Sequence, residues 1–171
     1  KNKIENYRSR LQNEINLVDA VIEKGYAKGL TIALNPSPFN KKLEACDLGK
    51  VGIFLLNEVE GEQLTGAHEE EEILRELGKR FPHARVVLTL GEKGVMYRDQ
   101  NGTLRQPAYK VNAVDTTAAG DTFTGFFLAA VVREYPTADA LRIASKASAL
   151  SVCRKGASSS IPAWDEVIRA L

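Results

Sequence analysis

The chain has 171 residues, of which 44% are hydrophobic and 26% charged, and its formal net charge is +1. This length and composition are typical of one globular domain with a sizeable core. The balanced charge gives no reason to expect nucleic acid or a membrane surface as partner, and no apolar run is long enough to span a bilayer. The cysteines, Cys46 and Cys153, lack metal-ligand spacing, which favours reduced thiols and a cytoplasmic location.

Hydrophobic periodicity predicts alternating elements through the first half of the chain. They are a helix over 16–28, strands over 30–34 and 51–56, helices over 59–64 and 69–80, and a strand over 85–90. A hairpin-like return over 95–98 and a strand near 103–106 follow. The last third is helical, with an apolar stripe from Phe123 to Val131, a helix that Thr137 could cap, and a short helix from Trp164 to Leu171. The order predicts an α/β fold whose mainly parallel sheet is covered by helices on both faces.

The segment from Asp115 to Phe123, DTTAAGDTF, is the strongest candidate for a functional site. Its small residues let the backbone approach a ligand closely, and the first N–H groups of the following helix favour an anion. Asp121 in such a site is placed to take a proton from an attacking hydroxyl while the amides hold the developing charge. This combination suits phosphoryl transfer to an alcohol. The alternative is structural, because Asp and Thr near a helix start also serve as ordinary caps.

Three further segments admit both a functional and a structural interpretation. Asn57 and Glu60 follow the strand over 51–56, where ligands collect in open sheets, and they suit a phosphate and a hydrated Mg²⁺ or simply a helix start. The glycines of TLGEKG (89–94) suit phosphates or adenosine, with a hairpin turn as the alternative. RKGASSSIP (154–162) is either an ion-binding nest or a solvent-facing loop that ends a helix.

Five motifs, taken in chain order, are similar to those of the ribokinase-like (PfkB) family of carbohydrate kinases. They are NPSP (35–38), NEVE (57–60), TLGEKG, DTTAAGDTF and RKGASSSIP. The similarity runs from about Leu11 to the C-terminus, and ribokinases are the branch that the motifs most resemble. The resemblance implies a three-layer α/β/α fold and ATP-dependent phosphorylation of a sugar hydroxyl, with ribose to ribose 5-phosphate favoured.

The resemblance also implies roles for individual residues. Asp121 matches the catalytic base, and the amides of an anion hole match Ala118, Ala119 and Gly120. The nucleotide-binding positions correspond to Asn57, Thr89, Leu90, Gly91, Glu92, Lys93, Gly94, Gly120 and Ser145. Glu60 matches the carboxylate that organises Mg²⁺ through water, while Glu14 and Asp121 match sugar-contacting positions. A K⁺ site that tunes the anion hole, partly through backbone oxygens, aligns with Asp115, Thr117, Ser151, Arg154, Gly156 and Ser160.

The resemblance departs at the front of the chain. Members of the family carry a longer N-terminal region with the first strands of the sheet, a Gly-Gly sugar-binding segment and a small β-lid. Residues 7–11 are too polar for the central strand that leads to Glu14 in the family. Residues 1–171 are therefore expected to be the C-terminal, nucleotide-binding portion of one domain. Because the groups that position the sugar are missing, we expect the isolated chain to bind nucleotide weakly and to transfer little or no phosphate.

Other sugars and another class of function stay open. Since the missing half selects the sugar, fructokinase, 2-keto-3-deoxygluconate kinase and nucleoside kinase activities are alternatives to ribose phosphorylation. A non-catalytic nucleotide-binding or interaction module made from half a kinase is the second class. The complete protein is expected to be a homodimer that uses ATP, Mg²⁺, K⁺ and a small-molecule sugar, with no nucleic acid or membrane partner.

Overall fold

The computed structural model describes residues 17–37 and 39–171, and the chain divides into two compact units. The first unit extends to Thr89 and also includes Met96–Leu104, while the second consists of Leu90–Val95 and Arg105–Leu171. The motif NEVE therefore belongs to the first unit, and DTTAAGDTF and RKGASSSIP belong to the second.

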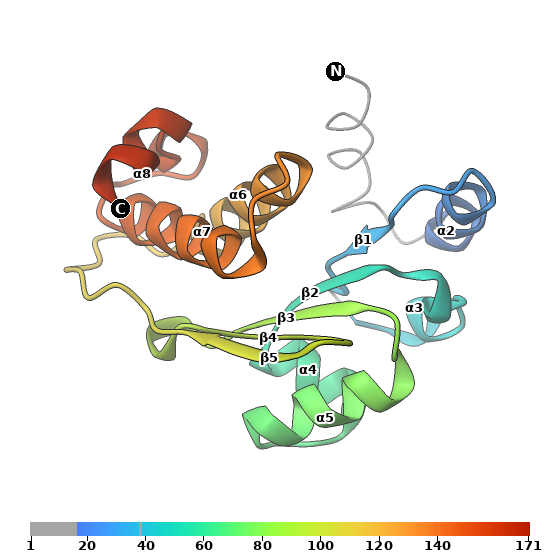
Figure 1. Ribbon diagram of the computed structural model, residues 1–171. Coiled ribbons are helices and arrows are strands. Elements are labelled where there is room, and N and C mark those ends of the chain that lie inside the picture. Colours follow the sequence, from blue (N-terminus) through green and yellow to red (C-terminus); the bar gives the residue numbers. More distant parts are fainter. Residues whose placement is uncertain (1–16, 38) are drawn as a thin grey trace. The chain divides into compact units, whose positions relative to one another are not determined.

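A five-stranded sheet has the strand order β1-β2-β3-β4-β5 (Figure 1). The strands are β1 (Ala33–Leu34), β2 (Ile53–Asn57), β3 (Arg85–Thr89), β4 (Val95–Asp99) and β5 (Gly102–Gln106). β2 pairs in parallel with both β1 and β3, and its last residue, Asn57, lies opposite Thr89. The turns that join β3, β4 and β5 are too short for a parallel crossover. The sheet is therefore mixed rather than mainly parallel.

Two helices of the first unit, α4 (Glu58–Thr65) and α5 (Glu70–Arg80), cover one face of β2 and β3 (Figure 1). α5 is amphipathic, with Ile73, Leu74 and Leu77 buried. The two helices approach closely at Gly61, where an added Cβ would lie 2.7 Å from Cγ2 of Ile73. Close packing at this point holds α4, and with it the NEVE motif, against the sheet.

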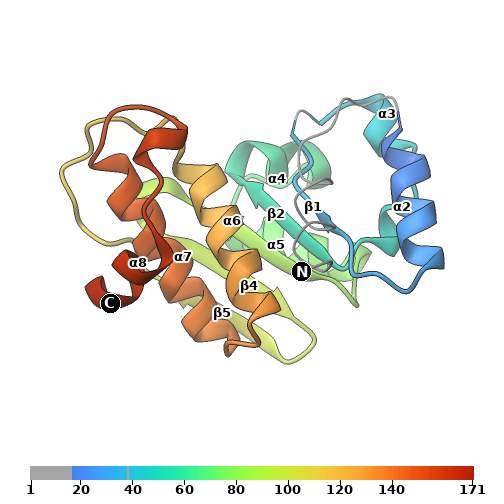
Figure 2. The same ribbon diagram turned by 90° about the horizontal axis from the view of Figure 1, so that it is seen from above.

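The remaining elements of the first unit are α2 (Val18–Ala27), α3 (Lys41–Glu44) and the 3₁₀ turn η1 (Leu48–Lys50) (Figure 2). The sequence pattern did not predict α3, a single turn capped by Asn40, whose Oδ1 accepts from the N–H groups of Lys42 and Leu43 at 3.0 and 3.2 Å. The strand expected over 30–34 is shorter, because only Ala33–Leu34 pairs with β2 before the chain reaches Pro36.

In the second unit, α6 (Ala119–Val132) and α7 (Thr137–Val152) lie side by side and α8 (Trp164–Ala170) packs on α7 (Figure 2). Irregular segments lead into α6 over 107–118 and join α7 to α8 over 153–163, the latter with the 3₁₀ turn η3 (Ser158–Ser160). Small buried residues of α7, such as Ala144 and Ala147, allow α6 and α7 to pack closely. Trp164 is a packing anchor, because its ring stacks on Phe126 at 5.5 Å between centroids. Thr137 is the first residue of α7 rather than its cap, a position held by Pro136.

Both cysteines are free thiols, as the sequence predicted. Among the residues that the structure describes, no helix combines the length and apolar character needed to cross a bilayer.

Candidate active site

Asp115 fastens the DTTAAGDTF motif to the RKGASSSIP loop. Its Oδ1 accepts hydrogen bonds from Oγ1 and N–H of Thr117, at 2.6 and 3.0 Å, and its Oδ2 accepts from the N–H of Gly156 at 3.0 Å. These bonds, the Thr117 hydroxyl foremost, stabilise the carboxylate and lower the pKa of Asp115 to about 2. The carboxylate is therefore ionised at neutral pH and ties together two segments separated by 41 positions.

Helix α7 is hydrogen-bonded to both ends of the bend over 114–119 that precedes α6. The carbonyl of Val152 accepts from the N–H groups of Val114 and Asp115, at 2.7 and 3.1 Å. One turn earlier on α7, the Ser148 hydroxyl donates to the carbonyl of Ala119 at 3.1 Å. The bend that precedes α6 is therefore fixed against a rigid helix.

The first turn of α6 carries the predicted base and anion hole. Ala118 is the buried N-cap residue, and the N–H of Ala119 donates to Thr116 O at 3.1 Å within the bend. Gly120 occupies the second helical position, where its N–H has no acceptor within the helix. Gly120 and Asp121 are both exposed, and an added Cβ at Gly120 would meet nothing within 4 Å. The backbone at Gly120 is therefore open to a ligand, and the helix dipole there favours an anion.

The sequence assigned no individual role to Thr122, which lies buried in the first turn of α6. Its side chain is 2% exposed, and its Oγ1 has no hydrogen-bond partner among the described residues. A threonine directly after Asp121 gives no periodic signal that separates it from an ordinary buried helix residue.

The RKGASSSIP loop is a tightly bonded turn. Gly156 has φ of 101°, a conformation that residues with a side chain rarely adopt, so the position favours glycine. Ser151 and Ser160 are each 1% exposed and donate to the carbonyls of Ser148 and Ala157, both at 2.8 Å. The loop is therefore held in its conformation by its own hydrogen bonds.

The Arg154 side chain pairs with Glu166 of α8, and this hydrogen bond lowers the pKa of the Glu166 carboxyl. The guanidinium therefore has a structural partner, and only the backbone oxygen of Arg154 suits a cation.

Asn57 and Glu60 form a capping box at the start of α4. Oδ1 of Asn57 accepts from the N–H of Glu60, and Oε2 of Glu60 accepts from the N–H of Asn57, both at 2.9 Å. This confirms the helix-start interpretation of the pair. Glu60 is 6% exposed. Its part in binding Mg²⁺ stays a prediction.

TLGEKG forms the turn between β3 and β4, with a 3₁₀ segment over Gly91–Lys93 and the N–H of Leu90 bonded to Gly94 O at 2.9 Å. Thr89 ends β3, and its hydroxyl donates to Leu56 O at 3.3 Å. Gly94 has φ of 102°, and an added Cβ would lie 2.2 Å from Gln106 O, so only glycine fits. This confirms the hairpin-turn interpretation of the motif, and its contact with a nucleotide stays a prediction.

The structure brings some of the predicted site residues together within each unit. In the first unit, Asn57 and Thr89 end neighbouring parallel strands. In the second, Asp115, Thr117 and Gly156 form one hydrogen-bonded group, with Ser151 bonded to Ser148 O on α7. Ser145 lies on α7 as well and is 8% exposed. Glu14, the predicted sugar contact, lies outside the described residues.

The donor set fits the cations that the motifs imply. No group of three His, Cys, Asp or Glu side chains that could hold a metal occurs in the described part of the chain. By residue type alone, Asp115 supplies one carboxylate at the predicted K⁺ positions, and Glu60 supplies one for Mg²⁺, which commonly binds one or two carboxylates while keeping its waters.

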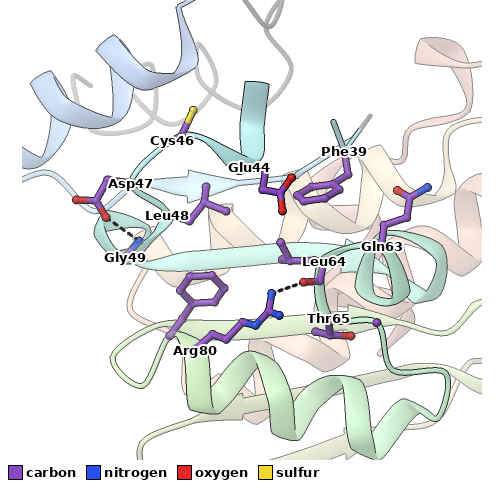
Figure 3. A pocket seen from close by; sticks show the side chains of 12 residues that line it. Phe39, Glu44, Cys46, Asp47, Leu48, Gly49, Gln63, Leu64, Thr65 and Arg80 are labelled. Atoms are coloured by element: carbon purple, nitrogen blue, oxygen red, sulfur yellow. Dashed lines mark hydrogen bonds between the residues drawn. The ribbon is translucent and has the colours of Figure 1, made fainter. Parts of the chain in front are cut away.

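A cavity of about 410 Å³ lies in the first unit, and no predicted site residue is among the residues that line it (Figure 3). Its walls come from the α3–η1 segment and from the ends of α4 and α5, so no single sequence motif marks it. Arg80 lines the cavity, and its Nη1 donates to Leu64 O at 2.5 Å. The one guanidinium among the lining residues is thus already hydrogen-bonded to a carbonyl that lines the same cavity.

Comparison with known proteins identifies the family. The sequence pattern of the pfkB family carbohydrate kinases matches residues 17–164. The chain is 37% identical to a ribokinase of Staphylococcus aureus, over 93% of this chain and 54% of that protein, and 32% identical to a deoxyribokinase of Salmonella typhimurium, over 92% and 53%. The chain thus spans about half the length of these curated relatives.

Solved structures agree with the sequence relatives. The fold is similar to that of ribokinase from Thermotoga maritima, with a TM-score of 0.74 and 31% identity over 93% of this chain and 54% of that one. It is also similar to Arabidopsis thaliana ribokinase complexed with ribose and ATP, with a TM-score of 0.78 and 27% identity over 99% and 58%. The chain belongs to the pfkB family of carbohydrate kinases, and its fold matches about half of the ribokinase structure.

Proposed function

We propose that this chain is the nucleotide-binding portion of a kinase that transfers the γ-phosphoryl group of ATP to a sugar hydroxyl, ribose being the favoured acceptor. The observation that carries the proposal is the bend held by Asp115, which leads directly into the exposed first turn of α6 with Gly120 and Asp121. The Staphylococcus aureus relative and the Arabidopsis structure with ribose and ATP support the choice of sugar.

Asp121 acts in this proposal as the general base. Its carboxylate accepts the proton of the attacking sugar hydroxyl, while the N–H of Gly120 and the α6 dipole stabilise negative charge on the transferred group. Ala118 and Ala119 complete the anion hole by shaping the bend. The N–H of Ala119 is bonded to Thr116 O in this structure, so Gly120 carries the larger share of the direct contact.

The remaining predicted residues bind the nucleotide and the cations. Asn57, Ser145 and the turn over 89–94 contact ATP. Glu60 orients hydrated Mg²⁺, which neutralises phosphate charge when bound. K⁺ is held near the anion hole by Asp115, Thr117, Ser151, Arg154, Gly156 and Ser160, mainly through oxygens of the bonded loop.

We also propose that residues 1–171 form part of a single three-layer α/β/α domain that is homodimeric when complete. The isolated chain is then expected to bind nucleotide weakly and to transfer little phosphate. Phosphorylation of another sugar and a purely nucleotide-binding role are the second candidates, because the chain covers only about half of its relatives.

The test measures nucleotide binding and turnover together in the wild type, Asp121→Asn and the control Asp165→Asn, an exposed residue of α8. Binding of MgATP is followed by NMR titration, and phosphorylated product is measured with ribose, fructose and 2-keto-3-deoxygluconate. We expect millimolar or tighter ATP binding by all three proteins. Any transfer activity falls by about 10²–10⁴-fold in Asp121→Asn alone, the usual contribution of a general base.

Three outcomes are decisive. Absence of ATP binding by the wild type contradicts the proposed function. If the wild type transfers phosphate measurably, unchanged turnover in Asp121→Asn removes Asp121 as the base. Vigorous transfer to ribose by the isolated chain supports the kinase and contradicts its inactivity as a fragment.

A further inference from the structure

Ser148 on α7 donates its hydroxyl hydrogen bond to Ala119 O at 3.1 Å, across the α6–α7 interface of the second unit. The accepting carbonyl belongs to the peptide group whose N–H is that of Gly120. Because Gly120 is the second residue of α6, this N–H has no acceptor within the helix. Ser148 therefore bonds to one end of the peptide group whose other end faces the proposed anion site.

The two ends of a peptide group are electronically coupled. A hydrogen bond donated to the carbonyl polarises the amide and strengthens its N–H as a donor, by the same effect that makes chains of hydrogen bonds cooperative. The bond also fixes the plane of the Ala119–Gly120 peptide group and hence the direction of the N–H. A carbonyl oxygen has two lone pairs, so Ala119 O can accept from Ser148 and from the helix backbone at once.

The neighbouring contacts of α7 make this bond part of a rigid support. Ser148 lies four positions before Val152, whose carbonyl accepts from the N–H groups of Val114 and Asp115. In addition, the buried Ser151 hydroxyl donates to Ser148 O at 2.8 Å. α7 thus fixes the bend where it starts and where it enters α6. Removal of the Ser148 hydroxyl releases only the second of these two points.

We propose that Ser148 is a positioning residue that orients and polarises the Gly120 N–H of the anion hole. The proposal rests on the proposed function for its consequence in phosphate binding, but the structural coupling stands on the hydrogen bond itself. Ser148 acts through the backbone of Ala119 and Gly120 and does not contact substrate.

The test uses the 171-residue chain and two independent readouts in Ser148→Ala, Ser148→Thr and the control Ser158→Ala, which alters an exposed serine of the RKGASSSIP loop. NMR resonances of the Ala119 carbonyl carbon and the Gly120 amide report the hydrogen bond directly. Titration with MgATP reports its consequence for phosphate binding. If Ser148→Ala does not fold, Ser148→Cys replaces it, since a thiol is a weak donor of similar size.

We expect Ser148→Ala to shift both resonances and to weaken MgATP binding by about twofold to threefold, in keeping with an indirect effect of one hydrogen bond. Ser148→Thr restores the resonances and the affinity, and Ser158→Ala changes neither. The inference is overturned if the Ala119 and Gly120 resonances do not move in Ser148→Ala, or if Ser148→Thr shows the same shifts. This holds whatever the affinity for MgATP. Resonance shifts in a chain that binds no ATP uphold the coupling and count against the proposed function instead.

Discussion

Replacement of Gly94 by alanine tests the backbone geometry of the TLGEKG turn. Gly94 has φ of 102° and ψ of −132°, a conformation that residues with a side chain rarely adopt. An added Cβ would lie 2.2 Å from Gln106 O and 2.7 Å from Ala108 N. Both are backbone atoms, so no side-chain rotation relieves the contact.

Two effects lower the free energy of unfolding of the Gly94→Ala variant. A residue forced into a sparsely populated backbone region costs about 1–3 kcal/mol. Overpacking against neighbours that cannot rotate away adds about 1–3 kcal/mol. The free energy of unfolding should therefore fall by about 4 kcal/mol, a large share of the roughly 5–15 kcal/mol available to a folded domain.

Gly91→Ala is the matched control, because Gly91 lies in the same turn with φ of 55° and an added Cβ there meets nothing within 4 Å. It should lose only about 1–2 kcal/mol, the cost of a left-handed conformation. Trp164 is the single tryptophan and lies in the same compact unit as both glycines, so its fluorescence reports urea unfolding of that unit. With a urea dependence of about 2 kcal/mol per M, the midpoint of Gly94→Ala falls by about 2 M. Equal midpoints for the two variants would refute the steric argument.

Three further expectations concern the charged and capping residues. The pKa of Asp115 is lowered to about 2, so the stabilising effect of its carboxylate on the fold is complete above the ordinary pKa of 3.8 and disappears as the pH falls toward 2. A carboxyl carbon NMR titration with a midpoint near 3.8 would contradict the bonds to Thr117 and Gly156. Asn57→Ala removes one half of a capping box and should lower the free energy of unfolding by about 1 kcal/mol in thermal melts, whereas Asn57→Ser should retain most of it. Arg154→Ala should return the lowered pKa of Glu166 toward its ordinary value, and an unchanged titration would show that the pair does not form in solution.

The sequence predicted most elements of the fold because hydrophobic periodicity is strong in them. α5 carries Ile73, Leu74 and Leu77 on one buried face, and β2 is a continuous apolar run, so both were predicted within one or two residues of their observed bounds. α3 was missed because a single turn stabilised by the Asn40 side chain has no periodic signal. The hairpin-like return over 95–98 and the strand near 103–106 were predicted and correspond to β4 and β5, but the expectation of a mainly parallel sheet gave too much weight to the early strands.

The candidate site was predictable to a different extent. Motif order located DTTAAGDTF and RKGASSSIP, but no spacing argument joins Asp115 to Gly156, 41 positions away, because that contact depends on how α7 returns the chain. Ser148 was missed for a related reason. It is one of several small residues on α7, and only the structure shows that its hydroxyl reaches Ala119 O.

The structural interpretation of these motifs is compatible with the proposed function, because the same hydrogen bonds would serve both. Asn57 and Glu60 cap α4, and the cap also holds both side chains beside the end of β2. Asp115 bonds a turn together, and the turn leads into the first N–H groups of α6. In the proposed function, a substitution at any of these positions would therefore lower both stability and ligand binding, so loss of activity alone would not identify a ligand contact. Gly120 and Asp121 lie in the exposed first turn of α6, where the proposed function places the transferred phosphate. Variants there that lose activity while retaining the free energy of unfolding provide the most direct evidence for phosphoryl transfer.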